Sequence, residues 1–302
     1  MNWVKNNKWK ITRRIVQIGV ILLLMTPIFG FSFFKGTLIS SEIFGISLTD
    51  PFAFLDYTLA TKTIYLPLLV SAILILGFYF LVGGRVFCSW ICPIFILTEI
   101  SEKLHDKFGV FNYKPSDSQK YWVLGVLLVL SLVTSKPVFE WISPIGIISQ
   151  NIALGVDFQG SEFGSELALG SGEDFGTSKE FLIEGRNETE WRFLFNSSLW
   201  LIFAIFLIDV FVAKGWWCKS TCPVGAFYSI VHKTSPTKIK IDHEVCTSCG
   251  DCFKVCLVSE VLKEPVKGTT KWVNDGVCTN CMNCVDACPE NALKLGLKIK
   301  QE

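Results

Sequence analysis

Eight of the twelve cysteines in this 302-residue chain fall in two identically spaced runs near its C-terminus. In each run two residues separate the first three cysteines, and a fourth cysteine follows after three more residues. This constrains the fold strongly, because so many closely spaced thiols have to converge on a small number of centres. The runs are Cys246-x-x-Cys249-x-x-Cys252-x-x-x-Cys256 and Cys278-x-x-Cys281-x-x-Cys284-x-x-x-Cys288-Pro289.

The spacing is that of bacterial two-cluster ferredoxins, in which the fourth cysteine of each run ligates the other cluster. Zinc is an alternative, since paired Cys-x-x-Cys motifs form tetrahedral sites. Zinc does not need the third closely spaced cysteine, however, and a disulfide framework suits short secreted domains. We therefore predict two 4Fe–4S clusters. Cluster one is assigned Cys246, Cys249, Cys252 and Cys288, and cluster two is assigned Cys278, Cys281, Cys284 and Cys256.

The tail, residues 235–302, is predicted to be a small cytoplasmic α+β domain of the bacterial two-cluster ferredoxin type. Asp251–Lys254 and Asn283–Asp286 predict short helical turns, and Val261–Leu262 and Ala292–Leu295 predict short strands. Such a domain has little core of its own, so the clusters are expected to supply much of its folding energy.

Half of the residues are hydrophobic and the mean hydropathy is +0.44, which is high for a soluble domain. Four apolar segments explain this value, and each approaches the roughly 20 residues of a membrane-spanning helix. We therefore predict a membrane all-α domain over residues 1–234 with four transmembrane helices. Their predicted ranges are Ile15–Phe34, Ile64–Val82, Tyr121–Ser135 and Phe193–Ala213.

The charges beside these segments predict an orientation, because basic flanks stay on the cytoplasmic side of a membrane. The N-terminal arm is basic and carries no acid, and four crossings return the C-terminus to the same side. We predict a multi-pass protein of the inner (cytoplasmic) membrane with both termini in the cytoplasm. The acid-rich loop Gly155–Arg192 is predicted to lie outside, as a solvated spacer rather than a docking site for a partner.

The predicted membrane part contains an internal repeat. In each copy two apolar segments are followed by Cys-x-x-x-Cys-Pro, first with Cys88 and Cys92, then with Cys218 and Cys222. We predict two two-helix units whose Cys-Pro motifs meet at the cytoplasmic side.

Each Cys-Pro motif precedes an amphipathic segment, and proline suits the first position of a helix. A helix start lowers the pKa of a thiol, which predicts reactive or metal-binding thiols. The alternative is that these cysteines are small apolar residues packing a helix junction. As functional groups they would hold a metal or cofactor, line a quinone pocket or form a docking surface for redox partners, and the sequence leaves these three open.

Other cofactors lack their motifs. No Cys-x-x-Cys-His occurs, so no c-type haem is predicted, and no nucleotide-phosphate loop is visible. His105, His232 and His243 all lie outside the predicted spans, which argues against a bis-histidine haem in the membrane. The net charge of +1 gives no indication of nucleic-acid binding.

The segments "LTDPF", "GGRVFCSWICP", "FEWISPIGI" and "KGWWCKSTCPVGAFY", together with the double cysteine run, resemble the NapH/MauN-type membrane ferredoxins over nearly the whole chain. The resemblance implies an electron-transfer subunit of a quinol dehydrogenase. It would pass electrons from membrane quinol (menaquinol or ubiquinol), with a NapG-like iron–sulfur subunit, towards a periplasmic nitrate reductase.

On this resemblance the four Cys-Pro thiols are parts of the membrane redox site or of a partner interface. Asp50 and Glu99 are the candidate proton acceptors by their location. Three alternatives remain: the same subunit in another respiratory system such as nitrous oxide reduction, a copper-reducing metalloenzyme assembly factor holding Cu(I) on the four thiols, and a structural anchor.

Overall fold

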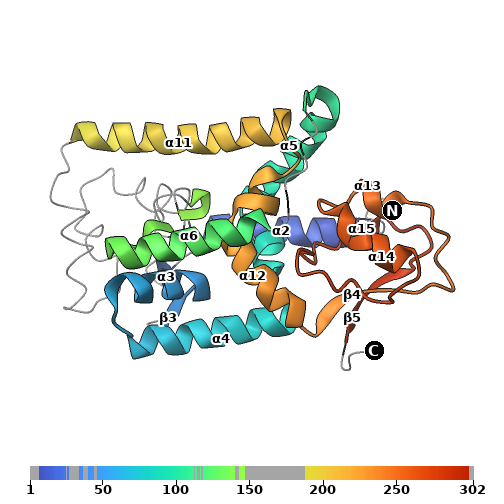
Figure 1. Cartoon of the computed structure of the whole chain (residues 1–302), viewed down its shortest axis with the longest axis horizontal. Helices are drawn as coiled ribbons and strands as arrows, with labels where there is room; N and C mark the ends of the chain where they lie inside the picture. Colours follow the sequence, from blue (N-terminus) through green and yellow to red (C-terminus); the bar gives the residue numbers. More distant parts are fainter. Residues whose placement is uncertain are drawn as a thin grey trace. The chain divides into compact units, whose positions relative to one another are not determined.

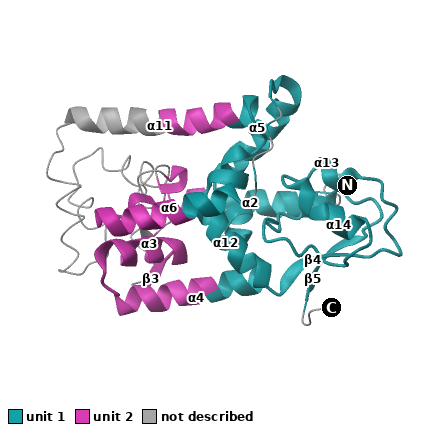
Figure 2. Ribbon diagram, viewed as in Figure 1, with its two compact units in different colours: residues 1–19, 77–124, 209–302 teal, residues 20–76, 125–208 magenta. Residues whose placement is uncertain are grey.

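The computed structural model of the chain (Figure 1) describes residues 7–24, 26, 34–36, 40–43, 46–111, 113, 116, 118–139, 143–146 and 188–298. The chain forms two compact units (Figure 2). One, here called the cysteine unit, contains all twelve cysteines and comprises Met1–Gly19, Gly77–Leu124 and Asp209–Glu302; the second unit comprises Val20–Leu76 and Gly125–Ile208. Most of the predicted acidic loop lies outside the described residues.

The second unit contains a three-stranded antiparallel sheet in the order β1-β2-β3, and helix α3 follows it directly. Asp50 caps α3, because its Oδ1 accepts the N–H of Phe52 at 2.9 Å and of Ala53 at 3.2 Å. Phe52 is buried and packs edge-on against Phe139 with 4.7 Å between ring centroids. The bounds are β1 Phe34–Gly36, β2 Ser40–Ile43, β3 Ile46–Thr49 and α3 Pro51–Thr61.

The four predicted spans correspond to four helices of the structure. Three of them have 17, 17 and 16 residues, short of the roughly 20 that a bilayer requires. The fourth has 24 residues but includes Asp209 and a charged first turn. They are α2 Lys8–Leu24, α4 Leu66–Val82, α6 Gln119–Thr134 and α11 Glu188–Phe211.

Within the described ranges, no helix combines the length and the hydropathy needed to cross a membrane. The predicted fold class with four transmembrane helices is therefore wrong. The prediction rested on runs of apolar residues alone. The helices that these residues form are shorter than a typical membrane span or contain charged residues.

The cysteine unit contains two modules with the same local structure. In each, a single π-helical turn carries the first cysteine of a Cys-Pro motif at its second position and leads into a longer helix. The N–H of Cys92 donates to Phe87 O at 3.0 Å, and that of Cys222 donates to Trp217 O at 2.8 Å, each across five residues. The elements are η2 Phe87–Ile91 with α5 Ile94–Phe108, and η4 Trp217–Thr221 with α12 Pro223–Thr234.

A glycine with left-handed backbone precedes each turn: Gly84 has φ +60° and Gly215 has φ +59°. At Gly84 the requirement is also steric, because a Cβ there would lie 2.3 Å from His232 Cα. The glycines allow the chain to reverse tightly before each Cys-Pro motif.

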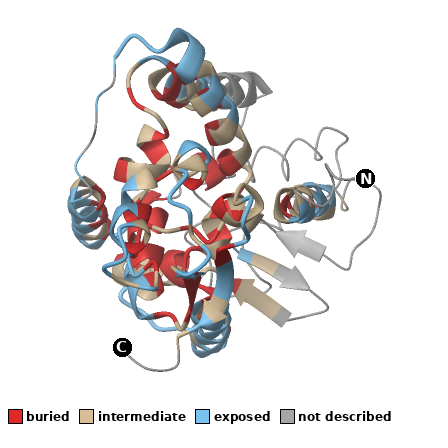
Figure 3. Cartoon of the chain, turned by 90° about the vertical axis from the view of Figure 1, so that its right-hand side faces the viewer, coloured by how far each residue is buried: buried red, intermediate tan, exposed pale blue. Residues whose placement is uncertain are grey.

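The tail is built on two antiparallel strands, β4 and β5, in which Ile241 stands opposite Leu293. Phe95 of α5 is buried in the same core, so the tail and the first Cys-Pro module share one hydrophobic interior. Figure 3 shows the buried residues gathered inside the chain and the exposed ones on outward faces. The elements are β4 Thr237–Ile241, α13 Asp251–Lys254, η5 Ser259–Leu262, α14 Lys263–Val266, α15 Asn283–Asp286 and β5 Leu293–Leu297.

The two helical turns of the tail are where the sequence predicts them, but its strands differ. Val261–Leu262 belongs to the 3₁₀ turn η5 instead of a strand, whereas Leu293–Leu297 does form one. Its partner β4 was not predicted. Val261 and Leu262 fill the core as apolar residues do in either structure, so their hydrophobicity does not distinguish a turn from a strand.

Asp50→Ala is expected to lower the stability of the second unit by about 1 kcal/mol, because two amides at the start of α3 lose their acceptor. Asp50→Asn, which keeps a capping oxygen, is the matched control. Thermal unfolding followed by circular dichroism measures the effect, and equal unfolding midpoints for the two variants would contradict the capping role.

Candidate metal centre

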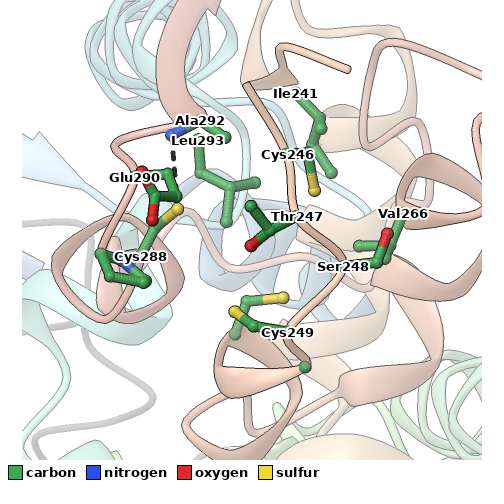
Figure 4. A pocket seen from close by; sticks show the side chains of 13 residues that line it. Ile241, Cys246, Thr247, Ser248, Cys249, Val266, Cys288, Glu290, Ala292 and Leu293 are labelled. Carbon is green, nitrogen blue, oxygen red and sulfur yellow. Dashed lines mark hydrogen bonds between the residues drawn. The ribbon is translucent and has the colours of Figure 1, made fainter. Parts of the chain in front are cut away.

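The first four predicted ligands line one cavity of about 400 Å³ in the tail. Cys246 and Cys249 come from the loop that leads into α13, Cys252 lies in α13 itself, and Cys288 comes from the second run. Figure 4 shows the sulfur atoms of Cys246, Cys249 and Cys288 facing this shared space. The Sγ of Cys288 also accepts the N–H of Ala292 at 3.3 Å.

The other four predicted ligands line a second cavity of about 410 Å³. Here Cys278, Cys281 and Cys284 come from the second run, and Cys256 crosses over from the first. The structure thus gathers the two sets of cysteines that the spacing assigns.

Both cysteine loops have the same backbone conformation. The residue before the second cysteine is left-handed in each, Ser248 (φ +53°) and Asn280 (φ +48°), and so is the residue after it, Gly250 (φ +83°) and Met282 (φ +62°). Alternation of this kind turns successive N–H groups to one side and forms concavities that bind anions, including iron–sulfur clusters. The loops therefore fit a cluster with a net negative charge.

Burial dominates the electrostatics of the second cavity. Desolvation raises the pKa of Cys278 to about 12 and raises the pKa values of Cys256 and Cys284 as well. Backbone N–H groups oppose this: that of Val258 donates to Cys256, and that of Asn280 to Cys278. Thiolates in such a place need cations beside them, which the irons of a cluster provide.

The four Cys-Pro thiols, which are 126 or more residues apart between the two motifs, come together in the cysteine unit. The thiol of Cys92 lies close enough to interact electrostatically with those of Cys88, Cys218 and Cys222. The Sγ of Cys218 is also 3.3 Å from Thr98 Oγ1. The structure therefore brings the thiols of the two motifs close to one another within this unit.

The lowering of the thiol pKa that a helix start predicts is outweighed at these cysteines by burial. Burial raises the pKa of Cys222 to about 12 and raises the pKa values of Cys92 and Cys218 strongly. The amide hydrogen bonds that lower these values are present, from Ile94 to Cys92 and from Val224 and Gly225 to Cys222. Desolvation outweighs them, because the thiols lie inside the unit rather than at its surface.

Side chains in and just before the first Cys-Pro module, together with Arg13 of α2, hold the loop of the second cavity by binding the loop's backbone carbonyls. Arg85 Nη1 donates to Val277 O at 2.7 Å, and Ser89 Oγ to Thr279 O at 2.7 Å. Two further donors, Trp90 Nε1 and Arg13 Nη1, bind the next two carbonyls. They reach Asn280 O at 3.1 Å and Cys281 O at 2.9 Å.

Arg85 also binds the second Cys-Pro motif, because its Nη2 donates to Cys218 O at 3.1 Å. Its positive charge lowers the pKa of both Cys222 and Cys278 against the effect of burial. This guanidinium, only 2% exposed, therefore stands between the Cys-Pro thiols and the second cavity. Sequence reasoning gave Arg85 no role at the site; its place three residues before Cys88 was the available signal.

The two predicted proton acceptors have structural partners. Asp50 caps α3, and Glu99 pairs with the fully buried Arg13 and with Arg14. Asp209 fits the role of a proton acceptor better than Asp50 or Glu99. It is buried, its carboxylate accepts the N–H of Trp217 at 3.2 Å, and burial raises its pKa to about 7. Its signal in the sequence is a single acid inside an apolar segment.

Within the described residues, no three Cys, His, Asp or Glu side chains are arranged to hold one metal ion. A cubane differs from a single ion because each thiolate binds its own iron at a different corner.

His232 gives this unit a pH dependence. It is buried, its Nδ1 donates to Gly83 O at 2.6 Å, and its Nε2 has no partner among the described residues. In the folded state, burial lowers the pKa of the His232 imidazole from 6.5 to about 4. The unfolded state therefore binds the proton more tightly, and stability is lost as pH falls from about 6.5 towards 4.

The wild-type chain is therefore expected to lose about 2 kcal/mol of stability between about pH 7 and pH 5 through this group. His232→Gln should remove that part of the dependence, and His243→Gln, on the tail, should leave it in place. Unfolding midpoints at the two pH values measure this, and an equal drop in wild type and His232→Gln would contradict it.

Comparisons with known proteins agree with this chemistry. A family described as a 4Fe–4S dicluster domain matches residues 238–289. A second family, described as a 4Fe–4S binding domain, matches residues 65–110 and 195–242, which contain the two Cys-Pro motifs. No solved structure matches the chain.

Several curated relatives match nearly the full length of the chain. The ferredoxin-type protein MauN of methylamine utilization from Methylorubrum extorquens is 32% identical over 98% of this chain and 91% of its own length. The ferredoxin-type protein NapH is 28% identical in Haemophilus influenzae (98% and 92% covered) and 29% in Escherichia coli (97% and 91% covered). This is an iron–sulfur electron-transfer protein, and the chain belongs to the family of NapH and MauN ferredoxin-type proteins.

Proposed function

We propose that the chain is the electron-transfer subunit of a quinol dehydrogenase. It takes electrons from quinol and passes them through its 4Fe–4S clusters and a partner iron–sulfur subunit towards a periplasmic nitrate reductase. One observation carries the proposal: the chain around the first Cys-Pro motif is joined to the loop of the second cysteine cavity by hydrogen bonds from Arg85, Ser89 and Trp90. Arg13 of α2 adds a fourth bond to the same loop. The likeness to proteins named NapH supports the choice of system.

Cluster one would be held by Cys246, Cys249, Cys252 and Cys288, and cluster two by Cys256, Cys278, Cys281 and Cys284. Such clusters supply one-electron transfer. The chain's residues hold the thiolates, exclude water and donate N–H groups to the sulfurs, all of which influence the reduction potential.

Two cluster sites also suit the stoichiometry of the reaction. Oxidation of one quinol to the quinone releases two electrons and two protons. The eight tail thiols provide places for two one-electron carriers, so one chain accepts both electrons in succession, and the two protons leave to solvent.

We propose that the protein works at the inner membrane with both termini on the cytoplasmic side. The start of α2 contacts the tail directly, because the N–H of Lys10 donates to Asp286 Oδ2 at 2.9 Å, which keeps the two ends of the chain together. Helix α6 presents an exposed apolar stripe at helical spacing, which favours contact with lipid or with an apolar partner. The stripe comprises Trp122, Val126, Val129 and Val133.

A copper-handling assembly factor is the second candidate function. The observation that favours it is the set of four neighbouring Cys-Pro thiols, since soft thiolates select Cu(I). A subunit of nitrous oxide respiration would have the same chemistry with another reductase.

The proposal predicts that a menaquinol analogue reduces the tail clusters in membranes containing the chain and its partner subunit. Electron paramagnetic resonance should show a reduced 4Fe–4S signal, and Cys88→Ser should slow its appearance at least tenfold while reduction by dithionite is unchanged. Ser220→Ala, in the same type of turn, is the control with all thiols intact. Clusters that dithionite reduces but excess quinol does not would overturn the proposal.

A further inference from the structure

The four Cys-Pro cysteines form a set that neither tail cavity uses. Each motif supplies only two thiols, so neither of the two stretches matched by the 4Fe–4S binding family holds four cysteines by itself. The chain satisfies a four-thiolate requirement in this region only if the two stretches act together.

The structure brings them together with matched geometry. In both motifs the first cysteine is the second residue of a π-helical turn, and the second cysteine follows the turn in an extended conformation. Cys92 has φ −65° and ψ 121°, and Cys222 has φ −64° and ψ 116°. The two halves therefore present their cysteines in the same local geometry, and the thiol of Cys92 lies close enough to those of Cys88, Cys218 and Cys222 to interact with them electrostatically.

The hydrogen bonds to the sulfurs follow the pattern of the tail ligands. The N–H two residues after the cysteine donates to the thiol of Cys92 and of Cys222, as it does at Cys256 and Cys278. N–H donors of this kind stabilise the negative charge of a cluster and influence its potential. A cysteine that merely packs a helix junction does not need them.

The surroundings also favour a cluster over a site for a hard cation. The groups recorded beside the four thiols are other thiols, the hydroxyl of Thr98, backbone amides and the Arg85 guanidinium, with Asp209 beside Cys218. Thiolates select iron–sulfur clusters, Cu(I) or zinc. A buried arginine next to the thiols opposes a further cation but stabilises a cluster of net negative charge.

We propose that Cys88, Cys92, Cys218 and Cys222 together hold one additional 4Fe–4S cluster, shared between the two halves of the repeat. It lies next to cluster two, because Arg85 binds Cys218 O and Val277 O at the same time. Electrons entering at the Cys-Pro site would reach cluster two before cluster one. The role of the third cluster rests on the proposed function, but its existence does not.

The test is the iron and acid-labile sulfide content of the anaerobically purified full-length chain, with Mössbauer spectroscopy to identify the cluster type. Three clusters give about twelve iron atoms per chain and two give about eight. Cys88→Ser and Cys222→Ser should each lower the content from about twelve to about eight, with the tail cluster signals unchanged. Ser220→Ala should keep about twelve.

About eight iron atoms in the wild-type chain with fully formed tail clusters would overturn the inference, without relying on any variant to fold. Copper or zinc in proportion to the chain with no additional iron would overturn it as well. About twelve iron atoms in a chain that quinol does not reduce would leave the third cluster standing and remove the quinol function.

Discussion

The structure of the cysteine unit depends on side chains of the first Cys-Pro module that bind backbone carbonyls around Cys278 and Cys281. Arg85 is central among them, because a buried guanidinium is stable only if its N–H groups are paired. One of its nitrogens binds the carbonyl of Val277, next to Cys278 in the tail, and another binds the carbonyl of Cys218 in the second Cys-Pro motif. Each neutral hydrogen bond of this kind contributes about 1 kcal/mol net, and those from charged groups more. The larger effect is geometric, since removing one donor leaves buried partners unpaired.

The tail and the first Cys-Pro module therefore share one hydrophobic core. The tail cannot be regarded as a separate ferredoxin tethered to a helical domain, because Phe95 of α5 packs into its core and Asp286 binds the start of α2. Burial then makes thiolates expensive unless irons accompany them, as the raised pKa values of Cys92 and Cys284 indicate. Folding of the unit and binding of its cofactors are therefore expected to be coupled.

Cysteine spacing was the most reliable part of the sequence. It pointed to the two sets of four that the structure gathers in two cavities, and the repeat pointed to the meeting of the Cys-Pro motifs. Hydropathy was less reliable, since α4 ends at Val82 with 17 residues. Local rules also failed where tertiary burial opposed them: the helix start at Cys222 did not give a low pKa. The role of Arg85 at the site could not be predicted from the sequence, because it depends on contacts with residues far along the chain.

Arg85 is expected to link the Cys-Pro site electrostatically with cluster two, because its charge acts on both Cys222 and Cys278. A potentiometric titration of the tail clusters, followed by electron paramagnetic resonance, tests it in the full-length chain with Arg85→Met and Arg85→Lys. Loss of the positive charge should make the potential of cluster two more negative in Arg85→Met, whereas Arg85→Lys should remain close to wild type and cluster one should not change. An unchanged potential of cluster two in an Arg85→Met chain that retains its clusters would contradict the account.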